Sequence, residues 1–183
     1  MRLLYLPLLC LFSWARAHGL AATPALPTLF FPNPQGSLYV GQTSALRAFF
    51  DRGGVIYEAH GAKVRVRYAH ANLHASIEAG EPLSARINLL LGETTSGWRR
   101  DIPTYQVLRY KDLYQGIDLK YCVEGDGIKS EFIVRPGADP TQIRLEYDDA
   151  EHISIDGRGN LIVRVEGGEW GRSTVIFQPS GQA

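Results

Sequence analysis

Apolar and polar residues alternate with a period of two along much of the chain, and this pattern constrains the fold more than any other feature. Residues 64–68 read VRVRY and residues 143–147 read IRLEY. Successive side chains of a strand point to opposite faces, so this alternation is typical of half-buried strands. No segment shows a convincing amphipathic helical period. The sequence therefore predicts an all-β fold, an antiparallel β-sandwich of roughly nine or ten strands with little helix.

Glycine-rich turns divide the predicted strands into hairpins. Ile117–Val123 and Ile128–Arg135 flank the loop EGDG, and Ile153–Ile155 and Leu161–Val165 flank DGRGN. Glycine and aspartate supply the backbone conformations that tight reversals need. Both segments are therefore predicted to be antiparallel hairpins.

Two shorter segments carry less regular patterns. Thr43–Asp51, TSALRAFFD, is predicted to form a helical turn or two around Ser44–Phe50. Val175–Gln178 is predicted to be a last short strand. An apolar strand at a sheet edge recruits other strands, so we expect self-association through this segment as concentration rises.

The N-terminus has the layout of a secretory signal peptide. Arg2 precedes an uncharged apolar run, Leu3–Trp14, and the small-x-small motif at residues 15–17 follows. The run is shorter than the roughly 20 residues that span a bilayer. We therefore expect cleavage between Ala17 and His18, export from the cell, and no membrane insertion afterwards.

The remaining chain is predicted to form one domain. Residues 18–36 contain four prolines, which fix the backbone and remove hydrogen-bond donors, and are predicted to be an extended leader. Residues 37–178 are assigned to the β-sandwich domain, and residues 179–183 to a C-terminal tail.

Charge and cysteine content exclude several classes of function. After signal cleavage 17 basic and 19 acidic side chains remain, a net charge of −2. This balance argues against an electrostatic grip on nucleic acid or on anionic membranes. Cys122 is the one cysteine left in the mature chain, which excludes an intramolecular disulfide and zinc sites built from paired cysteines.

Trp98–Tyr121 is the most aromatic segment, with one tryptophan and four tyrosines. In the favoured interpretation it is a structural sheet, whose tyrosines bury their rings and keep their hydroxyls near a partner. Its charged side chains are then expected to satisfy one another and nearby backbone groups; they are Arg99, Arg100, Asp101, Asp112 and Asp118. The alternative is a carbohydrate-binding face that uses exposed rings; its ligand-contacting residues would be Trp98, Tyr105 and Tyr110.

Metal sites are weakly supported. His70 and His74 are four residues apart, but the alternation of Leu73, Ala75 and Ile77 favours a strand, which would hold them about 13 Å apart. That separation is too long for a shared zinc ion. Two acidic groups suggest calcium, although glycine or arginine occupies positions where ligands would be needed; they are Glu124, Asp126 and Glu131, and Asp156 with Asn160. Turns are the favoured interpretation, and neither a metal nor another cofactor is predicted.

Nucleophilic catalysis has little support in the sequence. There is no G-x-S-x-G motif, and Cys122 lies in an apolar strand without a histidine beside it in sequence. Pairs of carboxylates that could serve a glycoside hydrolase occur in any chain with 19 acidic residues. A hydrolase is therefore the third hypothesis, after a binding module and a carbohydrate-binding module.

The C-terminal half resembles a known family. The segments that carry the resemblance are GWRRDIPTYQVLRYKDLYQGIDLKY, EFIVRPGADPTQIRLEY, ISIDGRGNLIVRVEGGEW and VIFQ, in that order. They are similar to the N-terminal domain of unknown function of secreted bacterial proteins that carry β-propeller (SBBP-type) repeats. The resemblance spans roughly Leu29–Gln178 and is strongest from Trp98 onward.

This resemblance implies an exported, β-rich domain without an established activity, and it supplies no catalytic residues. We therefore expect a secreted, non-enzymatic module that is an accessory or interaction domain of an extracellular propeller-repeat protein, encoded alone or as a truncated product. The expected partner is another protein or a downstream propeller domain, and the alternative ligand is a glycan.

Overall fold

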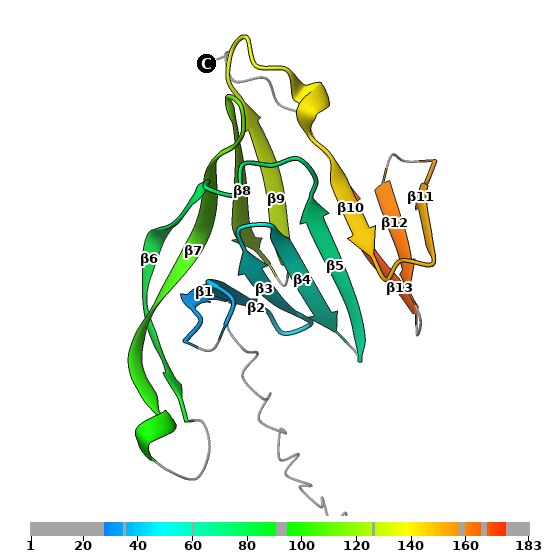
Figure 1. Cartoon of the computed structure of the whole chain (residues 1–183). Helices are drawn as coiled ribbons and strands as arrows, with labels where there is room; N and C mark the ends of the chain where they lie inside the picture. The colour runs from blue at the N-terminus through cyan, green and yellow to red at the C-terminus, as the bar shows by residue number, and fades with distance from the viewer. Residues whose placement is uncertain are drawn as a thin grey trace, which may run out of the picture.

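The computed structural model describes residues 28–34, 36–59, 61–90, 95–125, 127–157, 160–165 and 168–174. In these residues the chain is a succession of β-strands with two short 3₁₀ turns (Figure 1). The strands are β1 (Leu29–Pro32), β2 (Tyr39–Gln42), β3 (Arg47–Asp51), β4 (Gly54–Ala59), β5 (Ala62–Tyr68), β6 (Ser76–Leu89), β7 (Arg99–Tyr114), β8 (Ile117–Glu124), β9 (Gly127–Val134), β10 (Leu145–Asp148), β11 (His152–Ile155), β12 (Asn160–Val165) and β13 (Gly168–Thr174). The 3₁₀ turns are η1 (Thr95–Gly97) and η2 (Pro140–Gln142).

Ten strands form one antiparallel sheet in the order β10-β5-β4-β3-β2-β1-β7-β8-β9, with β6 paired to β7. The strands β1 to β5 are neighbours in the order of the sequence, because each is joined to the next by a short reversal. The sheet curls strongly, so that one of its faces is concave (Figure 1). The prediction of an all-β antiparallel fold with nine or ten strands is confirmed.

The alternation in the sequence decides which side chains enter the core. In β5, Val64, Val66 and Tyr68 are buried, whereas Arg65 and Arg67 are exposed on the other face. The same rule applies to neighbouring strands and produces one large apolar cluster. Its fully buried members include Phe30, Phe50, Val55, Leu108, Tyr110, Leu113, Ile117 and Leu119.

A second sheet of three strands, β11-β12-β13, shares this core. Val163 and Val165 of β12 are buried in the same cluster as the large sheet's side chains. Two sheets therefore enclose one apolar interior, and the larger sheet supplies most of it.

The strand β1 is buried on both faces. Phe30 points into the large core, whereas Leu29 and Phe31 join Val40 in a second, smaller cluster. Side chains from the hairpin β6–β7 and from β3 cover this cluster; they are Phe49, Leu83, Ile87, Leu89 and Ile102. This explains why the start of the domain reads as a continuous apolar run rather than an alternating one.

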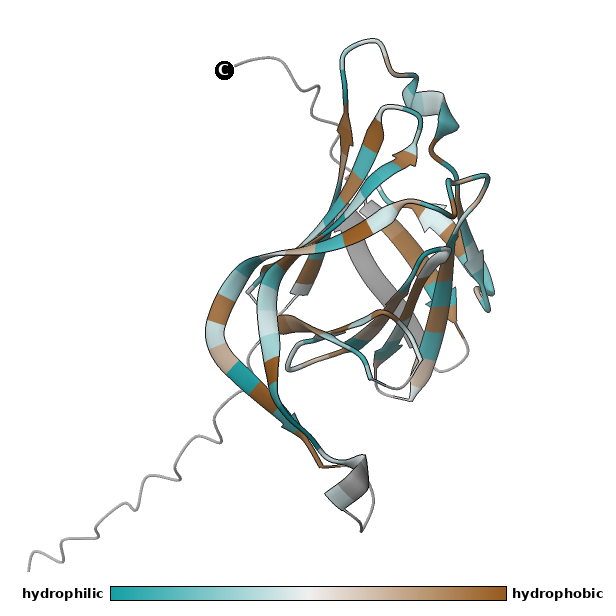
Figure 2. Cartoon of the chain, turned by 60° about the vertical axis from the view of Figure 1, so that its left-hand side comes forward, coloured by the Kyte–Doolittle hydropathy of each residue, from teal (hydrophilic) through white to brown (hydrophobic). Residues whose placement is uncertain are grey.

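The β6–β7 hairpin is much longer than the other hairpins. Its strands have 14 and 16 residues, and Figures 1 and 2 show it leaving the body of the molecule as a bent two-stranded ribbon. In the described chain β7 pairs with β8 from Val107 onward and with β1 at Tyr105. From Arg99 to Thr104 its one described partner is β6. We call this part, Leu83–Leu90 with residues 95–104, the arm.

The predicted helical turn at Ser44–Phe50 is wrong. Residues 43–46 form a tight turn, in which the N–H groups of Ala45 and Leu46 each donate to Thr43 Oγ1 at 3.0 Å. The strand β3 then follows, with Ala48 and Phe50 in the core. A side chain that satisfies the backbone locally competes with helix formation, and the cross-strand partners settle the outcome.

The predicted leader also extends too far. Residues 18–36 were expected to be extended and outside the domain, yet β1 starts at Leu29 and its side chain is buried. Proline is tolerated here because Pro32 is the last residue of the strand. The expected signal peptide, Val175–Gln178 and the C-terminal tail lie outside the described residues.

Candidate functional site: a polar cleft beside the β7–β8 turn

The turn between β7 and β8 organises one end of the molecule. Gly116 has a φ of 72°, a left-handed conformation that glycine adopts without strain. A Cβ at this position would lie 2.8 Å from the Cβ of Ala138, so the loop after β9 packs directly on the turn. The Arg135 N–H donates to the Gly116 carbonyl at 3.0 Å and holds the two segments together.

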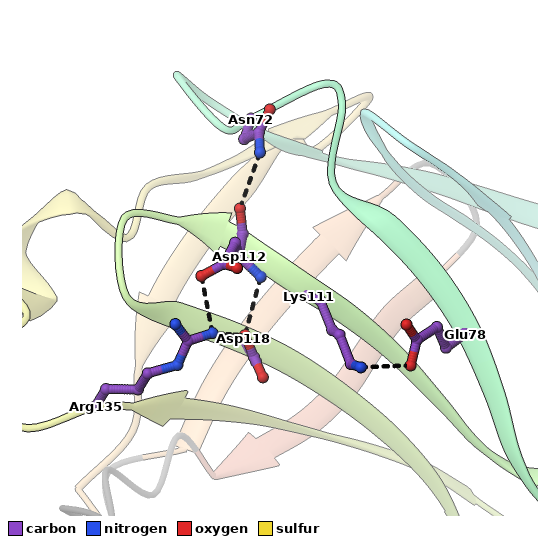
Figure 3. Close-up of polar contacts among 6 residues, drawn as sticks. All are labelled: Asn72, Glu78, Lys111, Asp112, Asp118 and Arg135. Carbon is purple, nitrogen blue, oxygen red and sulfur yellow. Dashed lines mark hydrogen bonds and ion pairs between the residues drawn. The ribbon is translucent and has the colours of Figure 1, made fainter.

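A charged cluster secures the same end (Figure 3). Asp118 is buried, and its Oδ1 accepts from the Asp112 N–H and from Arg135 Nη2, both at 2.9 Å. The same guanidinium lies 2.8 Å from Asp112 Oδ1. Asn72 Nδ2 donates to the Asp112 carbonyl at 3.2 Å and brings the β5–β6 loop onto the cluster. One arginine thus holds two carboxylates, and its contacts join β7, β8 and the end of β9.

This pairing differs in part from the one expected within Trp98–Tyr121. Bonds to nearby backbone groups are present as expected, because Asp118 accepts from the Asp112 N–H and Arg99 Nη1 donates to the Trp98 carbonyl. The ion pairs, however, are made with residues outside the segment. Asp112 and Asp118 share Arg135, which lies outside that segment, and Asp101 lies 3.8 Å from Arg86 of β6. Arg100 lies over the Trp98 ring, 5.3 Å from its centroid. The partners are set by strand pairing rather than by nearness in sequence.

The short turn η2 is capped by Asp139. The carboxylate of Asp139 accepts from the Thr141 N–H at 2.9 Å and from the Thr141 hydroxyl at 2.7 Å. These hydrogen bonds lower the pKa of Asp139 below its ordinary value. Gln142 Nε2 also donates to the Asp139 carbonyl, at 3.1 Å. The result is a well-defined polar turn beside the β7–β8 reversal.

A cleft of ≈ 440 Å³ opens between these parts, lined by His70, Tyr114, Thr141, Gln142 and Arg144. The Tyr114 ring is buried, and its hydroxyl donates to the Arg144 carbonyl at 2.9 Å. The Arg144 N–H approaches the same hydroxyl at 3.3 Å, and the Arg144 carbonyl also accepts from the Ala69 N–H at 2.9 Å. Backbone contacts on both sides therefore fix the position of residue 144.

The cleft is chemically polar and rich in donors. His70 and Arg144 are exposed, and Thr141 and Gln142 add a hydroxyl and an amide. The volume falls in the range of sites that hold small ligands. Arginine presents a planar fork of N–H donors that matches a carboxylate. The arrangement is suited to binding a small polar or anionic molecule.

The three residues expected to form a carbohydrate-binding face are not equivalent. Tyr110 is fully buried, so its ring cannot stack on a sugar, and the expectation is wrong for this residue. Tyr105 is half-buried on β7 opposite Phe30 and Pro82. Trp98 is half-buried beside η1. They do not form one exposed platform.

The buried tyrosines form a hydrogen-bonded chain that the sequence did not reveal. The hydroxyls of Tyr68 and Tyr121 are 2.8 Å apart, and Tyr110 donates to the Asp51 carbonyl at 2.8 Å. Side-chain hydrogen bonds also join Tyr110 to Tyr68 and Tyr57 to Tyr121. Burial raises the pKa of all four phenols, so each remains protonated. A signal was present in Val64–Tyr68, where a tyrosine occupies an inward position of the alternation.

The predicted metal candidates have other surroundings. His70 and His74 lie in the loop between β5 and β6 rather than on a strand, which begins at Ser76, so the strand expected at residues 73–77 starts too early. Glu131 and Glu124 both lie near the Lys129 ammonium, at 2.9 Å and 3.9 Å. In the residues that the structure describes, no group of three histidine, cysteine, aspartate or glutamate side chains could hold a metal ion. Asp126 and the side chain of Asn160 lie outside the described part.

Cys122 lies half-buried on β8, opposite Lys129 of β9. Burial raises the pKa of its thiol, and the nearby Glu131 carboxylate adds to the effect. The thiolate is the reactive form, so this environment lowers the reactivity of the cysteine.

Comparison with known proteins places the chain in a family. The profile of a domain of unknown function, DUF7948, matches residues 29–180. No curated protein and no solved structure matches the chain. Among the described residues, no helix is both long and apolar enough to cross a membrane. The match covers the whole described β structure from its first strand, and the chain therefore belongs to the DUF7948 family.

Proposed function

We propose that the protein is a non-enzymatic accessory or interaction domain of an exported protein, and that this protein carries β-propeller (SBBP-type) repeats. Export is supported by the charged residue, apolar run and small-x-small motif before His18. The propeller association is supported by the similarity of residues 98–178 to the N-terminal domain of such proteins, and the DUF7948 match over residues 29–180 agrees with a domain of this kind.

The arm is the observation that favours an interaction role. Its base packs on the small cluster around Phe31 and Val40, but its distal end leaves the body (Figure 2). There Leu90 is 58% exposed, and Trp98 is half-buried with Arg100 over its ring. We assign the binding surface to these three residues of the arm, since tryptophan and arginine are enriched among the residues that dominate interface energies.

The backbone of the arm also favours an interaction role. A two-stranded ribbon is only marginally stable in water by itself. Between Arg99 and Thr104, β7 has one described neighbour, so its outer edge can accept another strand. Pro103 and the register shift between Pro82 and Arg86 limit such pairing to short stretches. A partner of modest contact area, such as the repeat domain of the same exported protein, fits this surface.

Binding to a purified propeller-repeat domain from the same genome tests the proposal. Leu90→Asp and Trp98→Ala should each weaken binding about tenfold or more, which corresponds to about 1.4 kcal/mol. Leu73→Asp is the matched control, because Leu73 is 61% exposed but lies in the β5–β6 loop, away from the arm. Equal binding by all three variants, or no binding by the parent chain, would remove the arm from the proposal.

Export is tested separately. Mass spectrometry of the protein from the culture medium should find His18 as the first residue. A chain that retains Met1 outside the cell would overturn the expected cleavage.

A further inference from the structure

The cleft is lined by residues of the β5–β6 loop, the end of β7 and the segment of η2. These elements lie at the end of the molecule opposite the tip of the arm (Figure 1). The interaction role proposed for the arm makes no use of this cleft. The residues around it are held by backbone hydrogen bonds from three segments, namely the β5–β6 loop, the end of β7 and the residues after η2. The cleft is therefore a preformed feature of the fold.

Two positively charged or protonatable groups in this cleft have no hydrogen-bond or ion-pair partner within the described chain. Arg144 uses its backbone N–H and carbonyl to contact Tyr114 and Ala69, while its guanidinium makes no contact of this kind with the residues that the structure describes. The same holds for the imidazole of His70. Among the other exposed arginines, Arg67 binds Asp148, and Arg135 binds Asp112 and Asp118. Arg47 and Arg52 also have no such partner within the described chain, but they do not line the cleft.

The backbone at His70 supplies a second, independent observation. His70 has a φ of 59°, in the left-handed region that residues other than glycine seldom adopt. Strained backbone is retained at some sites where a side chain is held for binding. Four other described residues that are not glycine share this conformation, and none of them lines the cleft; they are Glu81, Asp101, Asp112 and Asp149. At His70 the conformation turns the chain after Tyr68, and His70 is one of the residues that line the cleft.

We propose that this cleft binds a small carboxylate-bearing ligand, of the size of an acidic mono- or disaccharide. The Arg144 guanidinium pairs with the carboxylate through two N–H groups, the geometry in which arginine binds carboxylates best. The His70 imidazole lies on the same wall, and Thr141 and Gln142 face the hydroxyl groups of the ligand. The volume of ≈ 440 Å³ accommodates a molecule of this size.

The charge of the surroundings favours a monoanion over a phosphate. The Asp139 carboxylate, which caps η2, is bound to Thr141 of the cleft wall. A phosphate ester carries nearly two negative charges and would lie near this carboxylate. The single Arg144 guanidinium could neutralise only one of those charges. A carboxylate carries one charge, and one arginine neutralises it.

Galacturonate and glucuronate, each with a single carboxylate, are suitable probes, with galactose as the neutral analogue and glucose 6-phosphate as the phosphate analogue. In titrations of the ¹⁵N-labelled chain, the two uronates should shift the amide signals of residues 69–71, 114–116 and 141–144, with a millimolar Kd. Galactose and glucose 6-phosphate should bind at least tenfold more weakly. Equal response to galactose or to the phosphate, or no response to either uronate, would overturn the proposal.

Two variants and a control separate the site from non-specific charge effects. Arg144→Gln removes the guanidinium but keeps the backbone contacts, so the melting temperature should stay the same and the uronate affinity should fall at least tenfold. His70→Asn should lower the uronate affinity several-fold, because the imidazole is lost. Asparagine tolerates the left-handed backbone, so the fold should be kept. Arg47→Gln removes an exposed arginine of β3 and should bind like the parent. Parental affinity in Arg144→Gln, or an equal loss in Arg47→Gln, would contradict the assignment. Neither result bears on the arm, whose partner binding is measured independently.

Discussion

The contact between Tyr68 and Tyr121 allows a quantitative test of the buried tyrosine chain. Their hydroxyl oxygens are 2.8 Å apart, and the two residues are only 4% and 3% exposed. The perturbation is to replace each by phenylalanine, alone and together. Phenylalanine preserves the ring and its packing, including the edge-to-face contact of Tyr121 with Phe50 at 4.9 Å. The change therefore isolates the hydroxyl groups.

The structure sets the expected magnitudes. Each single replacement leaves one buried hydroxyl without its partner, which costs about 1–3 kcal/mol of unfolding free energy. Tyr121→Phe should have the larger effect, because the Tyr121 hydroxyl contacts both Tyr68 and Tyr57. The double variant has phenylalanine at both positions, so the hydroxyl that each single variant leaves without a partner is absent too. The double variant should thus lose about 1 kcal/mol less than the sum of the two single losses.

Urea unfolding, followed by tyrosine and tryptophan fluorescence and by circular dichroism, measures the unfolding free energies of the parent, the two single variants and the double variant. In a chain of this size each kcal/mol corresponds to about 2–4 °C in melting temperature. Tyr105→Phe is the control, because Tyr105 is half-buried outside the chain of hydroxyls, and its stability should match the parent. If the two single losses simply add in the double variant, the hydroxyls do not interact and the proposed chain is wrong.

Three further predictions use the same structure. Burial raises the pKa of the core tyrosines in the folded state, so their contribution to stability is complete below the ordinary phenol pKa of about 10 and is lost as pH rises above it. The urea concentration at the unfolding midpoint should therefore decrease once the pH exceeds about 10, and a constant midpoint would contradict their burial. Asp118→Asn should lower the unfolding free energy by about 1–3 kcal/mol, because Asp118 is buried and bound to Arg135. Asp112→Asn, on the exposed side of the same arginine, should change stability little, and equal losses of stability in thermal denaturation would show that burial does not distinguish the two carboxylates. Gly54→Ala should strongly reduce stability in the same assay, because the new Cβ would lie 2.2 Å from the Val66 carbonyl oxygen. Gly53→Ala should be tolerated, because its Cβ would have its nearest neighbour, a Leu73 methyl group, 3.9 Å away. Similar melting temperatures for both variants would refute the predicted clash.

The motifs that carry the family resemblance acquire a physical role in the structure. In YxxLYxGIDL, Leu113, Ile117 and Leu119 are buried in the core, Gly116 forms the turn, and Asp118 binds the arginine. In RPGADP the arginine is that partner, the alanine packs on the turn, and the aspartate, Asp139, caps η2. The two motifs therefore form one packed end of the molecule.

Local patterns were enough to predict several of the strands and the β8–β9 and β11–β12 hairpins, but not β1, which was assigned to the leader. The inward positions of β5 and the reversal between β8 and β9 follow from side-chain alternation and from turn residues, which act over a few neighbouring positions. The helical turn near Ser44 was wrong for the opposite reason. Its short sequence has no strong local preference, and pairing of β3 with β2 and β4 decided its conformation.

The partners of polar groups depended on tertiary structure. Asp118 meets Arg135, and Tyr68 meets Tyr121 across 53 positions of sequence, because strand order and register bring them together. The cleft has the same origin, since His70 and Arg144 become neighbours only when the loops at one end of the sheet pack on the β7–β8 turn. By itself the sequence determined which faces of the strands are apolar, because that property belongs to each segment. Only the tertiary structure decided which side chains meet, because contacts between distant segments depend on how the whole sheet curls.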